Sequence, residues 1–73
     1  MKTTLKVECY SGYRGDETPR RFWLEGMSIE VKAVVDQWRD PEHRYFKVAV
    51  EGDATYILRH DPVTFEWALV SNR

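Results

Sequence analysis

The feature that most constrains the fold is an apolar-patterned run from Met27 to Arg39, MSIEVKAVVDQWR, between the turn at Gly26 and the break at Asp40-Pro41. Alternation, the period of a strand, collects one apolar face: Met27, Ile29, Val31, Ala33 and Val35. A helical period collects an equally apolar face: Met27, Val31, Val34, Val35 and Trp38. Periodicity by itself therefore does not decide between the two structures.

Residue types favour the strand. The run is rich in β-branched side chains, which suit a pleated surface better than a helix. Ser28 could cap a helix, but Val31 stands where a capping box needs Glu or Gln. We predict a strand over 27–39, with a bulge or sharp bend at the Val34-Val35 doublet. The alternative is a helix over 27–39, which would give an α+β domain.

Five further segments show the alternation of strands. They cover Thr3–Tyr10, Arg20–Glu25, Arg44–Val50, Ala54–Arg59 and Phe65–Val70. Turn-forming sequences separate them: Glu25-Gly26, Asp40-Pro41, Glu51-Gly52-Asp53 and Asp61-Pro62. A longer loop is predicted over Ser11–Pro19. The pattern predicts an all-β fold: a six-stranded antiparallel meander, curled into a partly open barrel so that few strand edges stay open.

Size and charge limit what the chain can do. Its 73 residues form a single domain, residues 1–73, and bury only about 60% of the surface of the unfolded chain. Ten aromatic residues, three Trp, four Tyr and three Phe, compensate by supplying large apolar side chains. The 11 basic and 12 acidic residues are spread evenly, which disfavours strong nonspecific binding to nucleic acid.

The sequence also predicts a location. Lys6 and Glu8 interrupt the apolar stretch that a signal peptide needs, and no run approaches the roughly 20 apolar residues of a membrane span. Cys9 is the only cysteine, so neither an internal disulfide nor a thiolate zinc cluster is expected. We expect a cytoplasmic monomer without membrane contact.

Catalytic motifs are not recognisable. His43 and His60 lie outside any metal-binding spacing, and we interpret both as solvated loop residues. The loop sequence GYRG lacks the Lys and Ser/Thr of a phosphate-binding loop. We therefore expect no enzyme, no metal site and no cofactor.

Arginines and aromatic residues interleave at three places, which favours binding. The candidate binding residues are Arg20, Arg21, Trp23, Trp38, Arg39, Arg44 and Tyr45. Trp, Tyr and Arg are the preferred anchors of protein interfaces, so an unknown protein partner is the first hypothesis. Rings and guanidinium groups also suit single-stranded nucleic acid, the alternative partner. In the structural interpretation, Trp38 and Trp67 belong to the core and the arginines only cover apolar surface.

A wider series of residues resembles a known family. The series comprises Pro19-Arg20-x-Phe22, Gly26, Val31, Asp36-x-Trp38-Arg39, Tyr45-Phe46-x-Val48, Gly52, Tyr56-x-Leu58, Asp61 and Trp67-x-Leu69. It is similar to a family of small uncharacterised bacterial all-β domains over about residues 18–70. Some members are encoded beside, or fused to, proteins related to Y-family translesion polymerases. The resemblance implies an all-β fold and an accessory role, associated with DNA repair in the nucleic-acid alternative, and it transfers no site residue.

Overall fold

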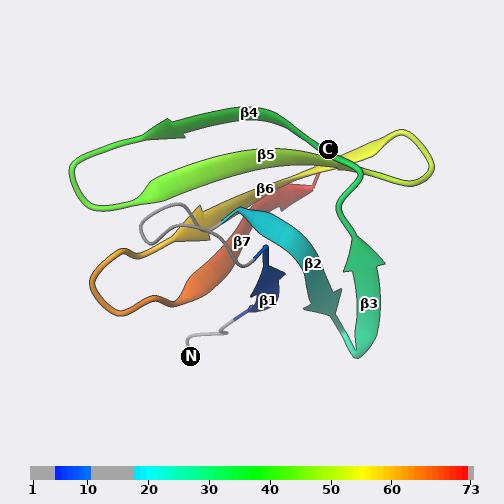
Figure 1. Cartoon of the computed structure of the whole chain (residues 1–73), viewed down its shortest axis with the longest axis horizontal. Coiled ribbons are helices and arrows are strands. Elements are labelled where there is room, and N and C mark those ends of the chain that lie inside the picture. Colours follow the sequence, from blue (N-terminus) through cyan, green and yellow to red (C-terminus); the bar gives the residue numbers. More distant parts are fainter. Residues whose placement is uncertain (1–4, 11–17, 73) are drawn as a thin grey trace.

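The structure, a computed structural model, describes residues 5–10 and 18–72 and is built from strands (Figure 1). The seven strands are β1 (Lys6–Cys9), β2 (Pro19–Leu24), β3 (Met27–Glu30), β4 (Ala33–Arg39), β5 (Arg44–Val50), β6 (Ala54–His60) and β7 (Trp67–Asn72). No helix occurs in the described ranges. The all-β prediction is confirmed, and the α+β alternative is wrong.

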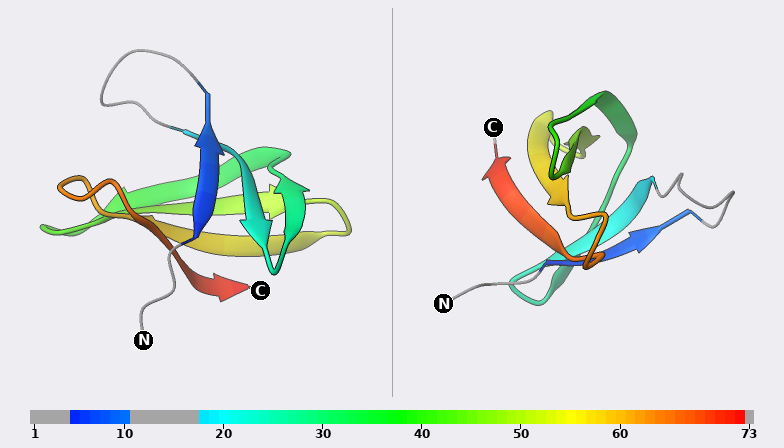
Figure 2. Two further views of the ribbon diagram at one scale, coloured as in Figure 1. Left: turned by 90° about the horizontal axis from the view of Figure 1, so that it is seen from below. Right: turned by 90° about the vertical axis from the view of Figure 1, so that its left-hand side faces the viewer.

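The strands form two antiparallel sheets, one in the order β1-β2-β3 and one in the order β4-β5-β6-β7. Figure 2 shows the first sheet running across the strands of the second. A single bridge between Leu5 and Trp67 joins them at one side, with the Leu5 amide donating to the Trp67 carbonyl over 2.8 Å. The chain itself joins them between β3 and β4.

Two details of the predicted fold are wrong for one physical reason: the run over 27–39 changes partner halfway. The Val31 amide still bonds to Arg20 in the first sheet, at 2.9 Å, but the Lys32 amide bonds to Ala49 in the second, at 2.8 Å. The run therefore counts as two strands, giving seven instead of six. It also separates the sheet into two, and no closed barrel forms among the described residues.

The run is extended, as predicted, and the register of β4 on β5 shifts between Val34 and Asp36. The bulge predicted at the Val34-Val35 doublet is therefore confirmed. It leaves Val35 56% exposed. The Asp36 carboxylate then accepts the next amide, that of Gln37, over 2.8 Å. A bulge and a capped amide are typical devices that protect an edge strand from pairing with another chain.

The core lies between the sheets and is centred on β5, not on the run over 27–39. The inward side chains of β5 (Phe46, Val48, Val50) are buried with Leu5, Phe22, Leu58 and Trp67. By contrast, β3 and β4 are edge strands whose residues are mostly exposed, Met27 to 69%. An edge strand has a neighbour on one side only, so it is less covered than a central one.

Two of the turns predicted from the sequence are present in the structure, and two predicted strand or loop boundaries differ from the observed ones. Glu25 and Gly26 both have positive φ, 52° and 81°, as a two-residue hairpin turn of type I′ requires. The Glu51-Gly52-Asp53 hairpin is confirmed as well. The final strand starts at Trp67 and not at Phe65, because Phe65 has φ 64° in the preceding loop and is 66% exposed. The loop predicted over Ser11–Pro19 lies outside the described residues at positions 11–17, and Pro19 begins β2.

Candidate binding surface

The candidate binding residues fall on two different sheets. Arg20, Arg21 and Trp23 lie on β2, whereas Trp38, Arg39, Arg44 and Tyr45 lie on β4 and β5. Strands β2 and β5 are not neighbours, so these residues do not form one surface across adjacent strands. The two groups also differ in how their charges are compensated.

The β2 group is neutralised within its own sheet. Register places Arg21 between Glu8 on β1 and Glu30 on β3, with N–O distances of 3.1 and 2.6 Å. The hydrogen bond to Glu30 raises the pKa of Arg21, and the same bond lowers the pKa of Glu30. Arg20 lies 4.0 Å from Glu8, with its guanidinium carbon 5.7 Å from the Tyr10 ring centroid. This face presents ion pairs instead of unpaired cations.

Trp23 is half-buried on the same sheet. Its ring is covered by the ammonium group of Lys6, 4.9 Å from the ring centroid. An aromatic ring that already holds a cation offers little free face to a partner. The β2 group therefore offers less free ring surface and fewer uncompensated charges than the sequence suggested.

Trp38 and Tyr45 form a stacked pair on the outer face of the four-stranded sheet. They are register partners on β4 and β5, with ring centroids 5.5 Å apart and planes inclined by 3°. Trp38 is 43% exposed, so the interpretation of Trp38 as core is wrong, whereas Trp67, 7% exposed, is core. Because β4 is an edge strand, Tyr45 covers one face of the indole, and none of the seven described strands lies beside the other face.

Arg59 completes this surface from the next strand. It is the register partner of Tyr45 on β6, so its side chain emerges on the same outer face. A hydrogen bond to Asp40 raises the pKa of Tyr45, and the nearby guanidinium of Arg59 partly opposes this shift. We call Trp38, Tyr45 and Arg59 the aromatic row. The sequence carried no signal for Arg59, because only the pairing register brings it beside the rings.

Arg39 and Arg44 do not belong to the aromatic row. They are register partners of each other, one residue away from the ring pair on each strand, and therefore point to the opposite face. On that face the guanidinium carbon of Arg44 lies 5.6 Å from the centroid of the buried Phe46 ring. A pocket of about 270 Å³ is lined by residues 37–39 and 44–46, which include Trp38 and Tyr45 of the aromatic row as well as the two arginines.

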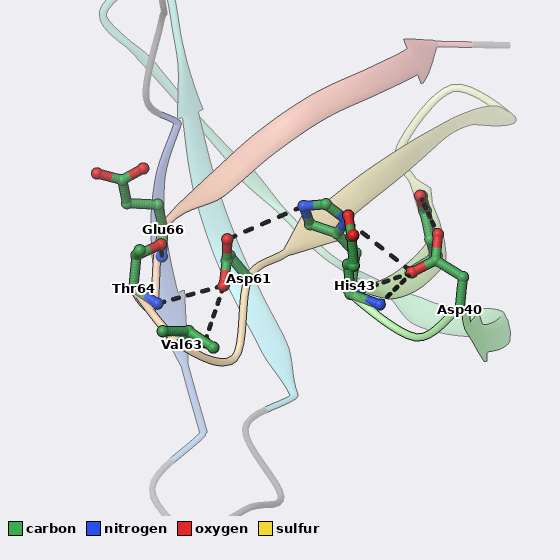
Figure 3. Close-up of polar contacts among 8 residues, drawn as sticks. Asp40, His43, Asp61, Val63, Thr64 and Glu66 are labelled. Carbon is green, nitrogen blue, oxygen red and sulfur yellow. Dashed lines mark hydrogen bonds and ion pairs between the residues drawn. The ribbon is translucent and has the colours of Figure 1, made fainter.

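The loops at this end of the sheet are held by two aspartates and a histidine (Figure 3). Asp40 accepts the amides of Glu42 and His43 over 2.8 and 2.7 Å, and the hydroxyl of Tyr45 over 3.0 Å. These bonds, first that from Glu42, lower the pKa of Asp40. The bond to Asp40 in turn raises the pKa of Tyr45. The loop therefore orients the Tyr45 phenol on which the Trp38 ring stacks.

The second Asp-Pro loop is built the same way and is linked to the first. Asp61 accepts the amides of Val63 and Thr64 over 2.8 and 3.2 Å, which lowers its pKa. His43 lies between the loops, with its ring nitrogens 3.9 Å from Asp40 and from Asp61 (Figure 3). The two loops thus form one polar network, which contacts the aromatic row through the Tyr45 hydroxyl.

We expect this network to make the protein sensitive to acid. Asp40 and Asp61 have lower pKa values in the folded protein than the value of about 3.9 in an unfolded chain. Their stabilising contribution is therefore complete above about pH 5 and is lost as the pH falls through the folded pKa values. A double variant, Asp40→Asn with Asp61→Asn, should lose stability less steeply between about pH 5 and 3. Urea unfolding at a series of pH values measures this slope.

The matched control for the acid experiment is Glu51→Gln, which changes an exposed carboxylate on the β5–β6 turn. It should leave the slope of the wild-type protein in place. An equally steep fall in the double Asn variant would mean that other groups cause the acid sensitivity.

The two histidines differ in setting: His43 lies in the loop between β4 and β5, and His60 does not lie in a loop. His60 is 3% exposed and packs against Trp67, with ring centroids 4.5 Å apart, so the prediction of a solvated loop residue is wrong for it. It is the last residue of β6, directly before Asp61. Within the described ranges no three His, Cys, Asp or Glu side chains gather in a way that could hold a metal ion.

No family model, no curated protein and no solved structure matches the chain. The part of the chain that the structure describes also contains no helix able to cross a bilayer.

Proposed function

We propose that this protein is a non-enzymatic binding module that contacts a protein partner through the aromatic row. The observation that carries the proposal is the stacked pair on an edge strand: Trp38 is 43% exposed and its indole is fixed against Tyr45. A ring held in one orientation loses little conformational freedom on binding, which is the usual property of an interface anchor. Arg59 supplies a guanidinium beside Tyr45.

The charge of the molecule favours protein over nucleic acid. The net charge is −1, and Arg21 on the other sheet is bound to Glu8 and Glu30. Affinity for nucleic acid depends largely on the number of phosphates that Lys and Arg neutralise. One arginine beside one exposed ring neutralises few phosphates, whereas protein interfaces commonly depend on a few such anchors.

The wider setting is part of the same proposal. We take the module to be a cytoplasmic monomer of the small bacterial all-β family that its residue pattern resembles. The capped edge of β4, with the Val35 bulge and the bond from Gln37 to Asp36, supports the monomer. We assign no catalytic residue, metal or cofactor to it.

The test compares Trp38→Ala with Trp23→Ala. Each variant, and the wild-type protein, serves as bait in quantitative affinity enrichment from extract of the source organism, and the affinity of each recovered partner is then measured with purified protein. Trp38→Ala should weaken binding about 30-fold or more, the size of a hot-spot effect. Trp23→Ala, which removes a half-buried ring already covered by Lys6, should change the affinity much less.

The same variants can contradict the proposal. Equal binding by Trp38→Ala and wild type would show that the aromatic row is not the interface. At the temperature of the binding measurement Trp38→Ala must still be fully folded, because a binding defect caused by unfolding says nothing about the surface.

Single-stranded nucleic acid remains the second candidate, because the face of Trp38 that Tyr45 does not cover could stack on a base, and Arg59 lies on the other side of Tyr45. An association with DNA repair, which the family resemblance implies, belongs to this candidate. Titration with oligothymidine at low salt should then quench indole fluorescence in the wild type and not in Trp38→Ala. A quench that weakens steeply with added salt would replace the protein partner with nucleic acid.

A further inference from the structure

Strand β3 has a free edge that points away from β2. The Val31 amide bonds to the Arg20 carbonyl, and in an antiparallel ladder such bonds recur at every second residue. The backbone groups of Ile29 therefore also point to β2, whereas those of Ser28 and Glu30 point the other way. Within the described ranges, the amides and carbonyls of Ser28 and Glu30 have no hydrogen-bond partner.

This edge is also the most regular of those that the described sheets present. The other edge strands are β1, β4 and β7, and each pairs with its neighbour through a register shift. The ladder of β3 on β2 runs without a shift. Bulged edges are poor templates for another chain, whereas a regular edge with unpaired amides and carbonyls is a good one. Of the described edges, β3 is therefore best suited to accept an added strand.

A pocket of about 510 Å³ lies along the free edge of β3, and we call it the β3 groove. Ser28 and Glu30 line it on the strand side, and Val50, Ala54 and Tyr56 line it from the β5–β6 hairpin. Val50 is buried, and Ala54 and Tyr56 are half-buried against the core. Alternate side chains of a strand point to one face. A chain that pairs with β3 would therefore place every second side chain against this apolar wall.

The charges around the β3 groove favour a basic occupant. The tip of the hairpin carries Glu51 and Asp53, and no ion pair among the described residues involves either of them. Lys32 is the base in the lining, and Glu30 is already bound to Arg21. Two uncompensated acids against one lysine leave a net negative charge beside the groove.

We propose that the β3 groove accepts a short, extended and basic segment of a partner protein as an added strand. Backbone hydrogen bonds to Ser28 and Glu30 supply affinity, and the apolar wall selects alternate side chains, which is the usual division in strand addition. The segment is short because the next amide on this edge, that of Lys32, already bonds to Ala49 in the other sheet. The groove shares no residue with the aromatic row, so this site does not rest on the proposed function.

The experiment is an NMR titration of the ¹⁵N-labelled protein with the peptide acetyl-Val-Lys-Val-Lys-Val-amide at pH 7. The backbone amides of Ser28 and Glu30 should shift in a saturable manner as they gain partners. The matched peptide with Glu in place of Lys should bind about threefold more weakly or worse, because it meets Glu51 and Asp53. If the Lys peptide causes no saturable shift at β3, the proposal is wrong.

Two N-methylated forms of the Lys peptide test the backbone pairing. One form carries methyl groups on the backbone nitrogens of its Lys residues and the other on those of its Val residues, so the side chains stay the same. Because alternate amides of a strand face the same neighbour, one form should lose about tenfold or more in affinity and the other much less. Equal affinities of the two forms would overturn strand addition.

Variants of the protein test the two sides of the groove. Ser28→Pro removes one edge donor, at a position where an edge strand tolerates proline, and should weaken binding of the Lys peptide about threefold to tenfold. Glu51→Gln should weaken it about twofold to fivefold, the effect of an exposed ion pair. Glu42→Gln, in the β4–β5 loop, changes an equally exposed acid and should have no effect. If Ser28→Pro does not fold, the methylated peptides still decide, because they leave the protein unchanged.

Trp38→Ala separates this site from the proposed interface, since it should bind the Lys peptide as the wild type does. A loss of peptide binding in Trp38→Ala would place the peptide at the aromatic row and overturn the assignment to the groove. Shifts at β3 that depend on protein concentration without peptide would also overturn it, because they would identify a second copy of the chain as the occupant.

Discussion

Phe22→Ala should remove most of the stability of the domain, a loss of about 3–5 kcal/mol in the free energy of unfolding. Phe22 is fully buried at 0% exposure, and its ring meets Tyr56 of the other sheet edge to face, with centroids 5.3 Å apart. It is thus a contact that holds the two sheets together. A domain of 73 residues has roughly 4–11 kcal/mol in total, at about 0.05–0.15 kcal/mol per residue.

Urea unfolding followed by circular dichroism measures this loss, and Phe65→Ala is its matched control. Phe65 is 66% exposed in the β6–β7 loop, so its truncation leaves no enclosed cavity. It should cost much less than Phe22→Ala. Similar midpoints for the two alanine variants would contradict the placement of Phe22 in the core.

Trp67→Ala should be the second severe change, with a loss of about 3–5 kcal/mol. The ring lies against Phe46 and His60, at centroid distances of 5.5 and 4.5 Å, and is 7% exposed. Its carbonyl also accepts the Leu5 amide in the bridge that joins the sheets. Alanine keeps that backbone bond but leaves a cavity beneath it, so the bridge would lose the packing that supports it.

Trp38→Ala is the control for this second change, since it truncates the same residue type at a 43% exposed position. The pair of variants separates the two roles of tryptophan in this protein. Trp67→Ala should lower the unfolding midpoint strongly, whereas Trp38→Ala should lower it slightly and affect binding instead. A midpoint for Trp67→Ala close to that of Trp38→Ala would mean that the sheets associate without this ring.

The position of the proposed binding surface follows from how the two sheets pack against each other. The core uses the inner faces of both sheets, so the outward side chains of β5 and β6 are only half-buried. The loop at Asp40 orients the rings on the outer face. Asp40 accepts a hydrogen bond from the Tyr45 hydroxyl, and the Trp38 ring stacks on Tyr45. A partner at the aromatic row would meet a surface that is already ordered.

Local patterns explain why much of the fold was predictable. The alternation over Arg44–Val50 predicted a strand, and its alternate apolar residues Phe46, Val48 and Val50 are all buried. Glu25-Gly26 and Glu51-Gly52-Asp53 identified two hairpins, since glycine adopts positive φ at little cost. The Val34-Val35 doublet marked the bulge. In each case the signal and its structural consequence lie within a few residues of each other.

The candidate site was only partly predictable, because it depends on which residues lie opposite one another. Trp38 and Tyr45 were found as neighbours of arginines in the sequence, yet alternation sends Arg39 and Arg44 to the other face. The arginine beside the rings is Arg59, which is distant in sequence and reaches them only through the register of β6 on β5.

The sequence by itself determined the strands, their turns and the inward face of β5, because period and turn chemistry are local properties of the chain. Only the tertiary structure decided that the run over 27–39 divides at Val31 and Lys32 between two sheets. That division exposes Trp38 on an edge and sets Arg39 against Arg44. Partner choice and register depend on contacts between distant segments, and no local pattern encodes them.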